Sequence, residues 1–211
     1  MGIDLARAGQ AVDTVIDHLL RVGIDGGGTL VSAQRAAERA LRAAPDPEAA
    51  IDRLITTHSR LAAAGGFATG LGGFAALPVA LPVNVLGFYA IATRMVAAIA
   101  AVRGYDLADP SVRTTVLLAL TGKDASQVIK HVGLGVDGVL AHALRAVSPT
   151  MLMVVNKAVA FRILIQIGRQ GIARFGRAIP VVGGLVGAAF DVLLLGRLAH
   201  EARQHFPNIP R

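Results

Sequence analysis

The chain has 211 residues, of which 54% are hydrophobic and 17% are charged, and it contains no cysteine. Typical soluble domains hold about 45–50% apolar and about 25% charged residues, so this composition excludes intrinsic disorder, a disulfide scaffold and thiolate metal sites. The formal net charge is +7, and residues 138–211 carry the excess, with nine basic and two acidic residues.

The first 60 residues are predicted to form amphipathic helices. Apolar residues recur at near-helical spacing over residues 4–22, and a run of glycines follows them. Thr29 is expected to cap a second helix. A third helix is predicted to start at Asp46 and Pro47, a capping acid followed by a proline in the first turn, and to end near residue 64.

Residues 61–93 carry no formal charge, and this run exceeds the ~20 residues that span a bilayer. Pro78 and Pro82 are expected to interrupt it, leaving a small-residue arm and a second apolar helix over residues 83–102. Small residues at four-residue spacing allow close helix approach, in a membrane or in a soluble core. They recur in a second glycine-rich segment after Pro180, and the two segments are expected to pack together as hairpins. The residues predicted to contact membrane or lipid are Gly66, Phe67, Gly70, Phe74, Gly183 and Gly187.

The remaining elements are also predicted to be helical. A helix is expected to start at Asp109, one or two short helices to occupy residues 124–147, and a basic helix to occupy about 151–168. No stretch shows the period-two alternation of a strand. We therefore expect an all-α fold, a compact helical domain with two glycine-rich apolar hairpin-like segments. Residues 1–60 and a helical domain over 61–205 are expected to form one compact unit.

The basic tract over residues 145–177 has six basic and no acidic residues. Such a tract attracts the phosphates of nucleic acid or of an anionic bilayer. Its apolar residues and its single aromatic, Phe161, disfavour nucleic acid and are typical of a basic amphipathic helix at a membrane surface. A core helix with a solvated basic face is the plainer alternative. The residues predicted to contact anionic lipid are Lys157, Arg162, Arg169, Arg174 and Arg177.

Two charged residues are isolated among apolar ones. Arg94 follows the long uncharged run, and Asp191 lies inside the second glycine-rich segment. Because an ion in apolar surroundings needs a partner or a wet cavity, the two are candidates for a buried pair. The alternative is that each lies at a solvent-facing seam.

No cofactor and no metal site is predicted. The histidines lack the spacing of metal ligands, since His200 and His205 lie five residues apart where a zinc-protease motif has four. The N-terminal residues lack the basic-then-apolar pattern of a signal peptide. We therefore expect a cytoplasmic protein, peripheral to or partly inserted in the inner membrane.

Two blocks of the sequence, over about residues 60–203, resemble the EcsC family of bacterial proteins. The motifs that match are Gly65-Gly66-Phe67, Leu77-Pro78, Leu81-Pro82-Val83-Asn84, Gly104-Tyr105-Asp106, Thr121-Gly122, Ile179-Pro180-Val181-Val182-Gly183-Gly184 and Phe190-Asp191. The family takes its name from a gene beside a bacterial ABC transporter, and the resemblance implies no established reaction. Residues 82–106 are also similar to a helical segment of membrane-linked domains attached to some bacterial GTPases.

These observations favour a non-enzymatic, membrane-associated helical protein with anionic membrane lipid as its partner. A membrane transporter and self-association are further candidate interactions. Two alternatives stay open. One is a soluble helical carrier of a lipid or other apolar ligand, and the other is a hydrolase with Asp106, Asn84 or Asp191 in its site.

Overall fold

The computed structural model of the chain describes residues 5–27, 30–71, 73–133, 140–175 and 180–209. Side chains within these ranges are described except at residues 5–8, 11, 66–71, 73–84, 123, 141–142, 166–175 and 180–187. The elements in chain order are α1 (Leu5–His18), the π-helical η1 (Leu19–Asp25), α2 (Ala33–Arg42), α3 (Pro47–Leu71), α4 (Gly73–Val102), α5 (Pro110–Ala119), the 3₁₀ turn η2 (Gly122–Asp124), α6 (Ala125–His131), α7 (Leu140–Ala143), the 3₁₀ turn η3 (Leu144–Ala146), α8 (Pro149–Phe175) and α9 (Pro180–His205). Every described element is helical, which confirms the predicted all-α fold.

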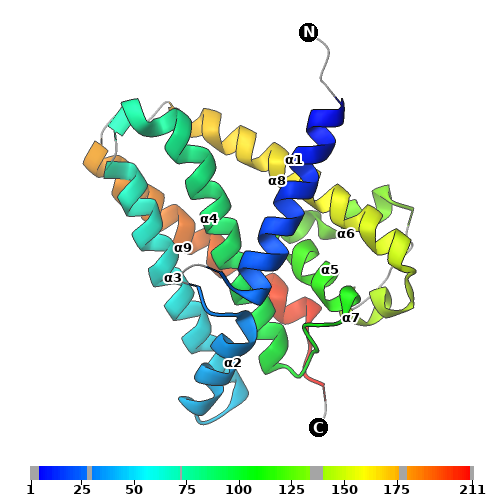
Figure 1. Cartoon of the computed structure of the whole chain (residues 1–211). Helices are drawn as coiled ribbons and strands as arrows, with labels where there is room; N and C mark the ends of the chain where they lie inside the picture. The colour runs from blue at the N-terminus through cyan, green and yellow to red at the C-terminus, as the bar shows by residue number, and fades with distance from the viewer. Residues whose placement is uncertain (1–4, 28–29, 72, 134–139, 176–179, 210–211) are drawn as a thin grey trace.

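Helix α4 forms the centre of the molecule (Figure 1). Residues 92–100 are each at most 9% exposed, and four of these nine are alanines. Their small side chains let neighbouring helices approach closely, and α2, α3, α5, α9 and η1 all pack around α4. A single hydrophobic core runs from Val12 to Phe206. The N-terminal helices therefore share their core with the rest of the chain.

The predicted break at Pro78 and Pro82 is wrong. Helix α4 begins at Gly73 and runs without interruption through both prolines to Val102. A proline removes one backbone hydrogen bond and often kinks a helix without ending it. Helix α3 also continues past Gly65 and Gly66 to Leu71, because glycine weakens a helix without forbidding it.

The helix starts predicted at two acidic residues are confirmed. The Asp46 Oδ1 accepts a hydrogen bond of 2.8 Å from the Ala49 N–H at the start of α3. The Asp109 Oδ1 accepts one of 2.8 Å from the Ser111 N–H at the start of α5. The predicted cap at Thr29 is wrong, because α2 begins later and Ser32 caps it.

Ion pairs connect distant parts of the chain at the helix ends. Arg203 on α9 pairs with Asp52 on α3 at 2.5 Å, and Arg103 after α4 pairs with Glu48 on α3 at 2.6 Å. Arg113 on α5 forms two hydrogen bonds, of 3.0 and 2.7 Å, with the carboxylate of Asp25 at the end of η1. These pairs orient the helix ends, while burial of apolar side chains supplies most of the stability.

Gly23 lets η1 approach α4 closely. A Cβ atom at this position would lie 2.6 Å from the Cβ of Thr93, which is fully buried. Because Thr93 is held by its helix, Gly23→Ala is expected to destabilise the protein by about 1–3 kcal/mol. Gly9→Ala on α1 is the matched control, since nothing lies within 4 Å of its added methyl group, and it should stabilise by about 0.5–1 kcal/mol. Urea unfolding of both variants measures this, and equal effects would contradict the proposed close approach.

Candidate functional site

Helix α8 carries apolar side chains on its solvent-facing side. Met153 and Phe161 are each 56% exposed, and Val154 and Ile165 lie beside them at 45% and 38%. Met153, Lys157, Phe161 and Ile165 follow one another at four-residue steps, which places them along one side of the helix. We call Met153, Val154, Phe161 and Ile165 the exposed apolar row.

The opposite side of α8 is buried and apolar as well. Leu152, Val155, Val159 and Ile163 are at most 6% exposed, and α8 packs against α1 and α5 (Figure 1). A helix that is apolar on both sides is typical of a core or of a membrane contact. Because its outer side meets no described element, the exposed apolar row is open to a partner.

The five basic residues predicted to contact anionic lipid divide into three groups. Lys157 is exposed within the apolar row, and its Nζ lies 3.6 Å from a carboxylate oxygen of Asp13 on α1. Arg162 is half-buried and pairs with Asp124, with 3.0 Å between its Nε and the Asp124 Oδ2, so its charge is already compensated. Arg169, Arg174 and Arg177 lie outside the residues whose side chains are described.

The predicted lipid contacts in the glycine-rich segments stay predictions. Gly66, Phe67, Gly70, Phe74, Gly183 and Gly187 all lie outside the described side chains. Within the described chain, Val85–Val102 of α4 is long and apolar enough to cross a membrane, and 78% of it is buried in the protein. Because a buried core helix passes the same test, this segment alone does not indicate a membrane span.

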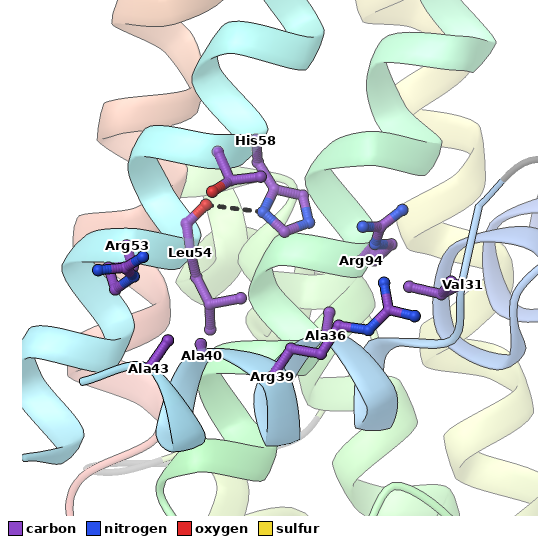
Figure 2. A pocket seen from close by; sticks show the side chains of 10 residues that line it. Val31, Ala36, Arg39, Ala40, Ala43, Arg53, Leu54, His58 and Arg94 are labelled. Carbon is purple, nitrogen blue, oxygen red and sulfur yellow. Dashed lines mark hydrogen bonds between the residues drawn. The ribbon is translucent and has the colours of Figure 1, made fainter.

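A pocket of about 240 Å³ lies between α2, α3 and α4 (Figure 2). Arg39 of α2, Arg53 of α3 and Arg94 of α4 line it, and none of its described lining residues is Asp or Glu. In Figure 2, the guanidinium groups of Arg39 and Arg94 point toward one another, and Arg53 stands on the far side of Leu54. The remaining lining residues are Val31, Ala36, Ala40, Ala43, Leu54, Thr57 and His58. The described lining thus gathers positive charge without an acid to balance it.

His58 is the most buried polar group of this pocket, with 1% of its surface exposed. Burial, helped by the positive charge of Arg94, lowers the pKa of His58 from 6.5 to about 4, although its hydrogen bond with Leu54 opposes this. The Nδ1–H donates to the Leu54 carbonyl at 2.7 Å, so Nε2 is unprotonated. That Nε2 has no hydrogen-bond partner in the described structure.

Arg94 is buried in the same pocket, with 9% of its surface exposed. Burial, together with the charge of Arg39, lowers the pKa of Arg94. Its Nε has no hydrogen-bond partner, and among described residues Arg94 forms no ion pair. Asp191 is also buried, on α9, at 3% exposure. No described contact joins Arg94 to Asp191, and the predicted pair stays a prediction.

The two residues of the hydrolase alternative whose side chains are described lie on different elements, Asp106 after α4 and Asp191 on α9. Asp106 is exposed in the loop after α4, where its Oδ1 accepts a hydrogen bond of 2.9 Å from the Ala108 N–H. The side chain of Asn84 lies outside the description. Among the described residues, no three His, Asp or Glu side chains are grouped as metal ligands are.

The arginine pocket was not predicted from the sequence. Arg39 and Arg94 lie 55 positions apart, with His58 between them, so no local motif joins the three. The one available signal was the isolation of Arg94 in an apolar helix, which predicted a buried charge but not its neighbours in the pocket.

The chain matches the model of the EcsC protein family over residues 7–207. The match starts well before residue 60, so it includes the helices that precede the motifs recognised in the sequence. No curated protein and no solved structure matches the chain. The family match covers nearly all of the chain, and the protein belongs to the EcsC family.

Proposed function

We propose that the protein binds the cytoplasmic face of a bacterial membrane through the outer side of α8. The observation that carries the proposal is the exposed apolar row, which lies in a tract with six basic residues and no acidic one. Apolar side chains enter the boundary between head groups and acyl chains, while the basic residues attract anionic lipid. The proposal assigns no reaction to the protein.

The apolar side chains and the basic residues are expected to contribute similar amounts to the binding free energy. Each half-exposed side chain of the row is expected to contribute about 1 kcal/mol on insertion. A basic residue near an anionic surface contributes about 1 kcal/mol. Lys157 supplies such a charge within the row, since its contact with Asp13 is long and solvent-exposed. Several side chains together therefore give reversible, salt-sensitive binding.

Vesicle co-sedimentation tests the proposal. The protein should sediment with phosphatidylglycerol vesicles and much less with phosphatidylcholine vesicles, and salt should weaken the binding. Phe161→Asp places a charge in the centre of the row, and it should lower the affinity about tenfold or more. Phe161 is 56% exposed, so the substitution should leave the fold intact, as thermal unfolding would verify.

Leu193→Asp is the matched control. Leu193 lies on α9 and is 67% exposed, and α9 has no comparable basic tract. It should bind vesicles like the wild type. Wild-type affinity in Phe161→Asp, or an equal loss in both variants, would show that α8 is not the membrane contact.

A further inference from the structure

The geometry points to an oxyanion site in the arginine pocket, selective for a singly protonated phosphate group. The pocket lies among α2, α3 and α4 (Figure 2), and no residue of α8 is among its described lining residues. It is a different site from the proposed membrane contact, and neither depends on the other.

The first reason is uncompensated charge. The guanidinium groups of Arg39 and Arg94 point toward one another (Figure 2), and no acidic residue is among the described residues that line the pocket. None of Arg39, Arg53 and Arg94 takes part in an ion pair among the described residues. Like charges at close range repel, especially where burial reduces screening. An anion between the two guanidinium groups would replace repulsion with charge-assisted hydrogen bonds.

The second reason is a pair of buried polar atoms without partners. Within the part of the chain that the structure describes, the Arg94 Nε and the His58 Nε2 both lack a hydrogen-bond partner, in side chains that are 9% and 1% exposed. Such groups are rare in folded proteins because each one loses its hydration without compensation. They differ in character, since Arg94 can only donate and His58 Nε2 can only accept.

That difference defines the ligand. A suitable group presents negatively charged oxygens to Arg39 and Arg94, and an O–H to His58 Nε2. A phosphate monoester or inorganic phosphate has such an O–H in its singly protonated form, with a second pKa of about 6. Sulfate and phosphodiesters are fully ionised and have no O–H. At about 240 Å³ the pocket is smaller than the ~300–1,000 Å³ sites of drug-sized ligands, which suits a head group rather than an acyl chain.

Thermal unfolding with added anions tests the site. Inorganic phosphate and glycerol 3-phosphate should raise the Tm by about 5–10 °C at a hundredfold excess over Kd. Sulfate at equal ionic strength should bind at least tenfold more weakly. The affinity for phosphate should also fall from pH 6 to pH 8, as the ligand loses its O–H. The charged groups that line the pocket with His58 are Arg39, Arg53 and Arg94.

Substitutions locate the site. Arg39→Ala and Arg94→Gln should each lower phosphate affinity at least tenfold. Arg42→Ala is the matched control, because Arg42 is exposed on the same helix and does not line the pocket. His58→Leu should abolish the preference for phosphate over sulfate. Arg39 is exposed, so its variant should fold even if a change at Arg94 disturbs the core.

Comparing soluble phosphates with lipid vesicles distinguishes the two possible sources of the phosphate group. A response to free phosphate or glycerol 3-phosphate identifies a soluble ligand, and a response only to phosphatidic acid vesicles identifies a lipid head group. No response to any of these would overturn the site. An equal response to phosphate and sulfate would overturn its selectivity, and an equal loss in Arg42→Ala would overturn its location.

Discussion

Acidification from pH 6.5 to pH 4 is expected to lower the free energy of unfolding by about 3 kcal/mol through His58 alone. Burial holds the pKa of His58 at about 4 in the folded protein, against 6.5 for an unperturbed side chain. The unfolded chain therefore binds a proton in this range that the folded protein excludes. The contribution of His58 to stability is complete above pH 6.5 and is lost as the pH falls toward 4. Each pKa unit corresponds to about 1.4 kcal/mol.

Urea unfolding at pH 7, 5 and 4 measures this effect, and His58→Leu should remove most of the slope. His205 adds a loss of the same sign, because burial lowers its pKa although Glu201 opposes this. His131→Leu is the matched control, since the exposed His131 also has its Nδ1 bonded to a carbonyl four residues earlier, at 2.8 Å. If His58→Leu lost as much stability in acid as the wild type, His58 would not be the acid-sensitive group.

Phe206→Ala is expected to destabilise the protein by about 3–5 kcal/mol. Phe206 is fully buried just after α9. Its ring packs edge-on against the ring of Tyr105, with 5.1 Å between the ring centroids and 73° between the ring planes. The guanidinium carbon of Arg145 lies 5.9 Å from the centre of the Tyr105 ring. Phe206 thus joins the end of α9 to the α4–α5 loop through Tyr105, and alanine would leave a cavity beside the Tyr105 ring.

Denaturant unfolding of Phe206→Ala and Phe206→Leu distinguishes the effect of lost side-chain volume from the effect of the lost aromatic contact. Leucine keeps most of the side-chain volume, so Phe206→Leu should lower the free energy of unfolding by less than about 2 kcal/mol. A double-mutant cycle with Tyr105→Leu should give a coupling of about 0.5–1.5 kcal/mol for the aromatic pair. A loss below 1 kcal/mol for Phe206→Ala would show that the end of α9 does not anchor the loop.

Local chemistry made the helix starts predictable. Asp46 and Asp109 cap the helices that follow them because a carboxylate before a proline satisfies free backbone N–H groups at short range. The interior of α4 was not predictable in this way. The prolines at 78 and 82 suggested an end, yet α4 is packed on several sides, and tertiary packing outweighs the loss of individual backbone bonds.

The pocket was unpredictable for a different reason. Its positively charged residues come from separate helices, and each helix alone has the sequence pattern of an ordinary amphipathic helix. Arg39 lies on α2, whose buried residues are alanines, and His58 lies four residues after Leu54 on α3. Only the approach of α2 and α3 to α4 places them beside Arg94. A charge in an apolar segment can thus be identified from sequence, whereas its neighbours require the fold.

The packing of α3 against α9 has a consequence during protein synthesis. No other described element packs as extensively on α3, yet the start of α9 follows the end of α3 by about 110 residues. At translation rates of about 5–20 residues per second, this gap corresponds to roughly 5–20 s. Throughout that time the nascent chain exposes the apolar surfaces that α9 later covers. The packing of α3 is therefore completed only once α9 has emerged from the ribosome.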